Sequence, residues 1–154
     1  IVLGVILELK TVLGGEVSCE EIKETIWYSV GSVKVCFMQE LTSIDTPGTT
    51  ISSVRDETVK GLSFYDNKKI IFLPERVAEK FPNLVAYLAT YCSIKSVGRG
   101  NFKDMKSLKE LWLSSNQIEK IPLGTFDDLK SLERIQLSKY SACSNFEFFS
   151  NLFP

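Results

Sequence analysis

The sequence predicts an α/β-type solenoid whose coils repeat about every 24 residues, and three observations support this fold class. First, residues 84–107 and 108–131 align without a gap, with apolar residues on apolar residues. Second, the apolar residues within each block are spaced neither as in a helix nor as in a simple strand. Third, weaker copies precede and follow the two blocks at nearly the same period. Self-similarity at a fixed period of this size is the signature of a solenoid.

The second block shows which backbone this spacing requires. Leu111 and Leu113 alternate as in a short strand, so they point inward while Trp112 points outward. Asn116 follows where the chain turns away from the strand, and its side-chain amide can satisfy backbone groups that the turn leaves unpaired. Pro122 would interrupt a helix. Each coil is therefore predicted to contain one short strand, a turn and an irregular returning arc.

The asparagine position recurs once in each coil. In the first block it holds Cys92, and in an earlier copy that is one residue longer it holds Asn67. We expect Asn67, Cys92 and Asn116 to form a structural column. At this position Cys92 is interpreted as a buried, weakly hydrogen-bonding group, with a reactive thiol as the alternative.

Residues 108–129 match the pattern L-x-x-L-x-L-x-x-N-x-I-x-x-I-P-x-x-x-F-x-x-L almost completely. The chain therefore resembles leucine-rich repeat proteins with 24-residue extracellular repeats. The resemblance implies a right-handed coil, with a short parallel sheet on the concave face and irregular or short helical segments on the convex face. It covers residues 59–138, as repeats at 59–83, 84–107 and 108–131 and a partial repeat at 132–138.

Residues 16–58 differ from the repeats. They resemble the cysteine-bearing N-terminal cap of secreted leucine-rich repeat proteins and receptor ectodomains, particularly those of insects. The stretches 33–38 and 49–54 are expected to be strands of a β cap. The cap cysteines, Cys19 and Cys36, are predicted to form a disulfide in an oxidising compartment, and two buried free thiols are the alternative.

The two ends of the chain carry no repeat. Residues 1–15 combine an apolar run with small residues, and we interpret them as a signal-peptide-like leader, either complete or truncated. A buried strand or short helix is the alternative. The leader and the cap cysteines together predict a secreted or extracellular protein. Residues 139–154 have no recognisable cap pattern, so we expect self-association through an uncapped C-terminal end.

The composition argues against several classes of function. A formal net charge of -1 gives no electrostatic reason to expect nucleic acid, and no apolar run approaches the roughly 20 residues of a membrane span. Histidine, the usual general base and commonest metal ligand, is absent, and neither a metal nor a cofactor is expected. The acid pairs Glu20–Glu21 and Asp127–Asp128 are interpreted as solvated. The chain is thus predicted not to be an enzyme, with a carboxylate-dependent hydrolase as a distant alternative.

Stacked strands place their outward residues in columns across the concave face, where we predict that a protein partner binds. An exposed apolar pair flanked by polar groups is typical of an interface, although a lone surface tryptophan is the alternative. Glu110 and Arg134 are expected to form a surface ion pair worth under about 1 kcal/mol. A second interpretation of the whole chain is a fragment of a longer receptor ectodomain. The predicted anchors are Tyr65, Leu88 and Trp112, and the predicted orienting groups are Glu110, Arg134 and Gln136.

Overall fold

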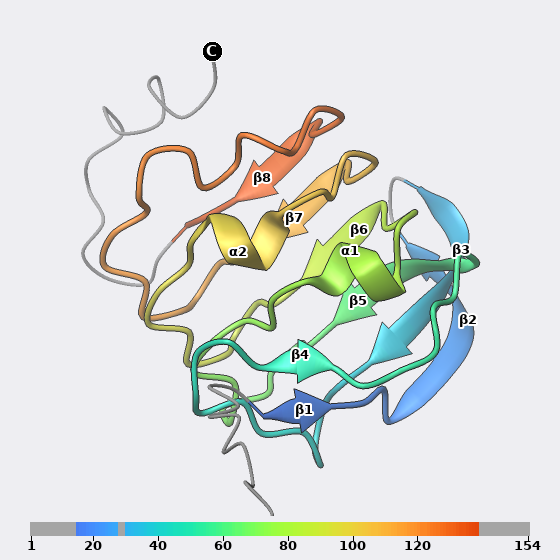
Figure 1. Cartoon of the computed structure of the whole chain (residues 1–154), viewed down its shortest axis with the longest axis horizontal. Coiled ribbons are helices and arrows are strands. Elements are labelled where there is room, and N and C mark those ends of the chain that lie inside the picture. The colour runs from blue at the N-terminus through green and yellow to red at the C-terminus, as the bar shows by residue number, and fades with distance from the viewer. Residues whose placement is uncertain (1–14, 28–29, 139–154) are drawn as a thin grey trace, which may run out of the picture.

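Each coil of the chain contributes one short strand to a common sheet (Figure 1). The computed structural model describes residues 15–27 and 30–138. Its main sheet has six strands, in the order β2-β3-β5-β6-β7-β8. The pair β2–β3 is antiparallel and every later pair is parallel, which confirms the predicted solenoid with a parallel sheet. The strands are β2 (Glu21–Trp27), β3 (Gly31–Phe37), β5 (Val59–Ser63), β6 (Ala86–Leu88), β7 (Glu110–Trp112) and β8 (Arg134–Gln136).

The register of the repeat strands follows the alignment of the repeats. Successive strands pair residues that occupy the same position in successive repeats, because parallel strands one coil apart bring equivalent residues side by side. Two columns therefore run across the sheet on its concave side. One column is Gly61, Ala86, Glu110 and Arg134, and the other is Ser63, Leu88, Trp112 and Gln136.

The opposite side of the sheet covers a continuous apolar core. Leu62, Tyr87 and Leu111 occupy equivalent positions in the three central strands, and all three are fully buried. Aromatic rings contact one another along the stack, both within a coil (Tyr87 and Phe102) and between successive coils. The centroid distances are 5.8 Å for Phe64–Tyr87, 5.9 Å for Tyr87–Phe102 and 5.5 Å for Phe102–Phe126. Offset or tilted ring pairs at this separation add to the burial of apolar area, so the core links each coil to the next.

A left-handed residue turns the chain away from the sheet in each coil. Asp66, Tyr91 and Ser115 have φ of 58°, 60° and 57°. Each directly precedes one of the three positions of the predicted asparagine column. This conformation costs a residue other than glycine roughly 1–2 kcal/mol, so the contacts that follow the turn must hold it in place.

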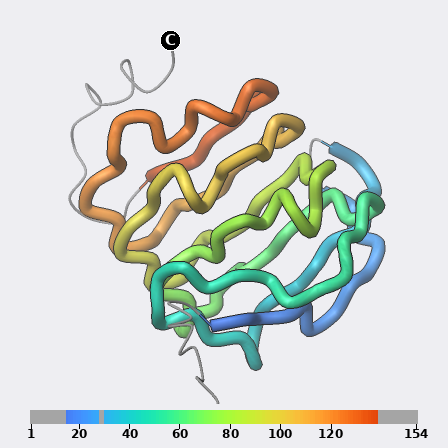
Figure 2. The backbone as a smooth tube through the Cα atoms, viewed as in Figure 1, coloured from blue at the N-terminus to red at the C-terminus, as the bar shows by residue number. Residues whose placement is uncertain are grey.

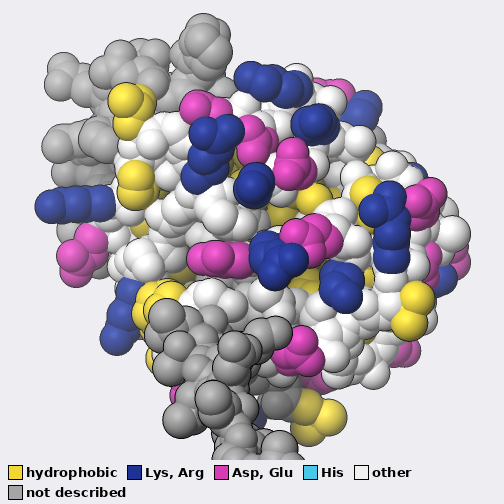
Figure 3. All heavy atoms as spheres, viewed as in Figure 1, with side chains coloured by type: hydrophobic (Ala, Val, Ile, Leu, Met, Phe, Trp, Pro, Cys, Tyr) yellow, Lys and Arg dark blue, Asp and Glu magenta, His cyan; other side chains and the backbone are white. Residues whose placement is uncertain are grey.

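The convex side is made of returning arcs that lie side by side along the stack (Figure 2). Two arcs include a single helical turn, α1 (Val77–Lys80) and α2 (Arg99–Phe102). Acidic and basic side chains are interspersed on the face seen in Figure 3. All the lysines and the arginine from Lys95 to Lys109 are exposed, as expected of a solvated surface. Within the described residues, no helix has the length and apolarity to cross a membrane.

The segment before the first repeat adds strands at the N-terminal end of the solenoid. β3 lies close to the expected strand at 33–38, whereas the expected strand at 49–54 is reduced to β4 (Thr50–Ile51), which pairs with β1 (Glu16–Val17). Strand β2 was not predicted, because its apolar residues alternate with charged ones only weakly. Among the described residues, β2 lies at one edge of the main sheet and β8 at the other.

A disulfide between Cys19 and Cys36 closes this segment, as predicted, with a Cα–Cα distance of 5.4 Å. Cys36 is fully buried against the core, whereas Cys19 is partly buried. The predictions for residues 1–14 and 139–154, including the leader and self-association through the tail, lie outside the described residues.

Candidate binding groove on the concave face

A groove of about 620 Å³ crosses the concave side of the sheet from the β2–β3 hairpin to β8. Four of the predicted site residues line it, namely Tyr65, Leu88, Trp112 and Gln136. In the described part of the chain, every residue lining this groove is uncharged. The groove therefore combines apolar and aromatic surface with neutral hydrogen-bonding groups, within the usual volume range of ligand sites.

The aromatic part of the groove comes from three coils and from the hairpin. Tyr65 and Tyr91 form an edge-to-face pair at 5.8 Å, and their side chains are 46% and 44% exposed. Trp112 and Leu88 are neighbours in register, but both are partly buried. Trp112 therefore points outward as expected, but its ring is only partly exposed because adjacent groove residues cover part of it. Ile26, which was not predicted, stands at the rim and is 84% exposed.

A row of hydroxyl groups crosses the strands beside these rings. Thr90, Ser114 and Ser138 occupy one position in successive coils, and all three line the groove. The hydroxyls of Ser114 and Ser138 lie 3.1 Å apart and hydrogen bond to each other. The row thus presents donors and acceptors without a formal charge.

The other end of the concave face is occupied by Trp27, which sequence reasoning missed. Trp27 Nε1 donates a hydrogen bond of 3.1 Å to Glu110 Oε2, and Arg134 Nη1 lies 2.9 Å from Glu110 Oε1. Glu110 is only 2% exposed. The expected ion pair between Glu110 and Arg134 is present, but only Arg134 is exposed, because Glu110 is buried beneath the tryptophan. Neither charged residue lines the groove.

Two small residues allow Trp27 to lie on this face. Gly61 and Ala86 precede Glu110 in the same column. A Cβ atom at Gly61 would lie 3.3 Å from the Trp27 ring and 2.8 Å from Val35 Cγ2, so a side chain there would displace one or both. Trp27, Val35 and Ala86 belong to a second, smaller apolar cluster. The only sequence signal for this contact was the run of small residues in an outward column.

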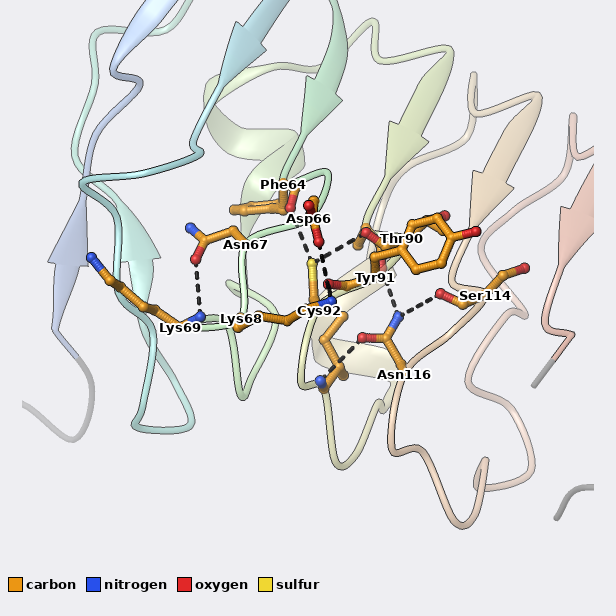
Figure 4. Close-up of polar contacts among 12 residues, drawn as sticks. Phe64, Asp66, Asn67, Lys68, Lys69, Thr90, Tyr91, Cys92, Ser114 and Asn116 are labelled. Atoms are coloured by element: carbon orange, nitrogen blue, oxygen red, sulfur yellow. Dashed lines mark hydrogen bonds and ion pairs between the residues drawn. The ribbon is translucent and has the colours of Figure 1, made fainter. Parts of the chain in front are cut away.

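The residues of the asparagine column (Asn67, Cys92 and Asn116) hold the turns that follow the strands of the sheet (Figure 4). Asn116 Nδ2 donates to the carbonyls of Ala89 and Leu113 at 2.6 and 2.9 Å, and its Oδ1 accepts from the Ile94 amide at 3.1 Å. Asn67 Nδ2 likewise donates to the Thr42 carbonyl at 2.9 Å. The bond to Leu113 holds the turn itself, whereas the bonds to Ala89 and Ile94 reach the preceding coil and the bond to Thr42 reaches the N-terminal cap, so the column also joins successive parts of the stack.

Cys92 occupies the same column, where its thiol is a weaker hydrogen-bonding group than the asparagine amide. Its Sγ donates to the Phe64 carbonyl at 3.0 Å. Burial raises the pKa of the Cys92 thiol to about 11, so the sulfur is protonated at neutral pH and available as a donor. A protonated, buried thiol is a poor nucleophile, which disfavours the alternative of a reactive cysteine.

Two acidic side chains from the pairs interpreted as solvated also hold loops. Asp128 accepts from the Asp104 amide at 3.1 Å and pairs with Arg99 at 2.9 Å, and both contacts lower its pKa. For Glu20, burial acts to raise the pKa, but hydrogen bonds donated by Thr42 and Leu41 outweigh it and the pKa is lowered. Their neighbours Glu21 and Asp127 are exposed. Within the described residues, no three acidic or cysteine side chains converge on a possible metal site.

Removing the acceptor at Glu110 is expected to release Trp27 from the sheet. Glu110→Leu should lower the free energy of unfolding by about 2 kcal/mol, because the buried indole N–H loses its partner. Glu110→Gln keeps a neutral acceptor and should cost much less. In a Trp112→Phe background, fluorescence reports on Trp27 alone, and its emission should shift to the red for the leucine variant only. Equal red shifts for both variants would contradict this role of the hydrogen bond.

One comparison with known proteins agrees with this geometry. The sequence model of the family described as "Leucine rich repeat" matches residues 90–139. A search of curated proteins finds no match to the chain. The matched residues contain β7, the Asn116 turn and β8, which are parts of successive coils of the same stack. From the parallel sheet, the repeated turns and this family match, we conclude that the chain folds as a leucine-rich repeat solenoid.

Proposed function

We propose that the chain is a non-catalytic, extracellular protein-binding module that recognises its partner through the concave groove. Leucine-rich repeat domains generally serve as protein-interaction modules, and their solenoid presents an extended concave surface suited to this role. The observation that carries the proposal is the uncharged groove of aromatic, aliphatic and hydroxyl side chains that spans the strands.

The composition of the groove is that of a protein-recognition surface. Tyrosine and tryptophan offer a large contact area at a small loss of conformational entropy, and serine and threonine add adaptable hydrogen bonds. Tyr65, Tyr91 and Trp112 supply the first kind of contact, and Thr90 and Ser114 supply the second. Apolar anchors surrounded by polar groups are also the usual arrangement of binding hot spots.

The proposed extracellular location is supported by the cap. A disulfide between Cys19 and Cys36 persists in oxidising compartments and is rare in the cytosol. It is compatible with the secreted protein that the leader-like N-terminus suggests. Secretion of the native chain, measured by its recovery from culture medium with Cys19 and Cys36 oxidised, tests this part of the proposal directly.

Partner binding is tested by photo-crosslinking from the groove. A benzophenone amino acid placed at Tyr91 should crosslink one defined protein from extracellular fluid, identified by mass spectrometry, whereas the same group at the exposed Lys120 should not. Crosslinking from Lys120 alone would contradict the proposal.

A matched pair of substitutions gives the control. Ile26 and Val54 are both β-branched and 84% and 88% exposed, but only Ile26 lines the groove. Ile26→Arg should weaken binding of the identified partner at least tenfold, because it places an unpaired charge at an apolar contact. Val54→Arg should leave the affinity unchanged. Equal effects of the two substitutions would place the interface elsewhere.

A further inference from the structure

Two residues that line the groove each carry a buried polar atom without a hydrogen-bond partner. The atoms are Trp112 Nε1 and Thr90 Oγ1, and neither has a partner among the described residues. Thr90 as a whole is 7% exposed, and both residues line the groove. Buried polar groups in proteins are nearly always paired, so two orphans in one groove require an explanation.

The two atoms come from neighbouring strands. Leu88 of β6 pairs with Trp112 of β7, and Thr90 follows Leu88 by two residues on the same side. Thr90 and Trp112 are therefore diagonal neighbours, within reach of large side chains. Indole N–H is only a donor, and a threonine hydroxyl can also donate. A single acceptor atom from a ligand can thus satisfy both groups.

The electrostatic surroundings indicate that this acceptor is neutral. A carboxylate would lose its hydration in a groove whose lining, as described, contains no charged residue, and such desolvation is costly without a counter-charge. The nearby cation Lys68 is already engaged, since its Nζ lies 3.1 Å from Asp66 Oδ1 and also donates to the Tyr91 carbonyl. An amide carbonyl meets the requirement for a strong acceptor without charge.

The shape of the groove favours an extended segment. It is lined from β2 to β8, and five strand spacings of about 4.8 Å amount to about 24 Å, the length of about seven extended residues. The hydroxyls of Ser114 and Ser138 continue the row beside Thr90 and offer neutral contacts to further backbone groups.

We propose that the groove binds an extended, uncharged peptide segment of the partner, which places one backbone carbonyl against Trp112 Nε1 and the Thr90 hydroxyl. An aliphatic or aromatic side chain of this segment packs against Leu88 and Tyr65. Small rotations of interface side chains, which are common on binding, open the two donors to the ligand. This inference rests on the proposed protein-binding function and adds the chemistry of the bound segment.

The probe is a library of displayed linear twelve-residue peptides, selected on the intact immobilised chain. Enriched peptides should be free of charged residues over the bound stretch.

Two substitutions test the donors directly. Trp112→Phe keeps a ring and Thr90→Val keeps the shape, but each removes one donor, and each should weaken peptide binding by about tenfold. Thermal unfolding of the free variants should be unchanged or occur at a higher temperature, because an unsatisfied buried group has been removed. Ser114→Ala, which removes a hydroxyl already paired within the protein, is the control and should have a smaller effect on binding.

The outcomes separate this inference from the function on which it rests. One outcome would overturn the carbonyl contact and leave the binding function standing. In it, the peptides compete with the crosslinked partner and no longer bind the Ile26→Arg variant, but they bind the Trp112→Phe and Thr90→Val variants with full affinity. Enrichment of acidic or basic peptides would also overturn the carbonyl contact. If acetyl-leucinamide binds as tightly as the best peptide, the occupant is a small neutral molecule and the extended segment is wrong. Absence of both a groove-directed peptide and a crosslinked partner would reject the function and the inference together.

Discussion

Asn116→Leu is expected to lower the free energy of unfolding by about 3 kcal/mol, the upper part of the range for a buried group that loses its partner. The leucine has a similar volume but cannot bond the Ile94 amide or the carbonyls of Ala89 and Leu113, which Asn116 contacts at 3.1, 2.6 and 2.9 Å. The left-handed Ser115 that precedes it would also lose the contacts that hold its turn. Urea unfolding followed by circular dichroism measures the loss as a lower midpoint.

The adjacent Gln117 provides a matched control. It is an exposed amide, so Gln117→Leu makes nearly the same chemical change one residue away and should alter the free energy of unfolding by less than about 0.5 kcal/mol. Cys92→Ala, which removes one weaker bond to the Phe64 carbonyl, should have an intermediate effect. Equal losses at positions 116 and 117 would mean that the asparagine column does not support the stack.

Removing the disulfide by the double substitution Cys19→Ala and Cys36→Ala is expected to cost about 3 kcal/mol, as the chain-entropy treatment gives for a loop of this size. The two residues are separated by 17 positions, and the bond restricts the unfolded chain around β2. The native hairpin should be affected first, because β2 is an edge strand with only one neighbour. Chemical denaturation gives the change in stability, and hydrogen exchange should show faster opening of β2 and β3 than of β6 and β7.

The reducing agent supplies the control for this prediction. Dithiothreitol should destabilise the native chain by about as much as the double substitution and should not affect the double variant. Cys92→Ala retains the disulfide and should remain sensitive to the reductant. A double variant as stable as the native chain, with unchanged exchange in β2, would show that the N-terminal strands are held by their packing alone.

The two columns of the concave face have different roles. At the N-terminal ends of the strands, Trp27 covers Gly61 and Ala86 and bonds Glu110, so this area is part of the folded structure. Beyond it, the residues from Leu88 and Trp112 onward remain available and line the groove. The hairpin that carries Trp27 therefore also sets where on the concave face a partner can bind.

The repeat period in the sequence was sufficient to predict the architecture. Because each coil repeats the last, the alignment of Leu111 with Tyr87 and of Trp112 with Leu88 translated directly into inter-strand register. It also placed the turn residue Asn116 one coil beyond Cys92. Such features depend on local spacing, and local spacing is repeated identically along a solenoid.

Only the tertiary structure showed which residues of the concave face are covered by the N-terminal hairpin. Trp27 meets Glu110 across 83 residues of sequence, and this contact joins the non-repeating hairpin to a repeat, so no period could reveal it. Because of this contact, Glu110 is buried although it lies in an outward column. The packing of the groove likewise leaves Trp112 only partly exposed. The sequence by itself thus determined which residues share a column, whereas the folding of the hairpin over the sheet decided which of them are covered, because burial depends on contacts that are not periodic.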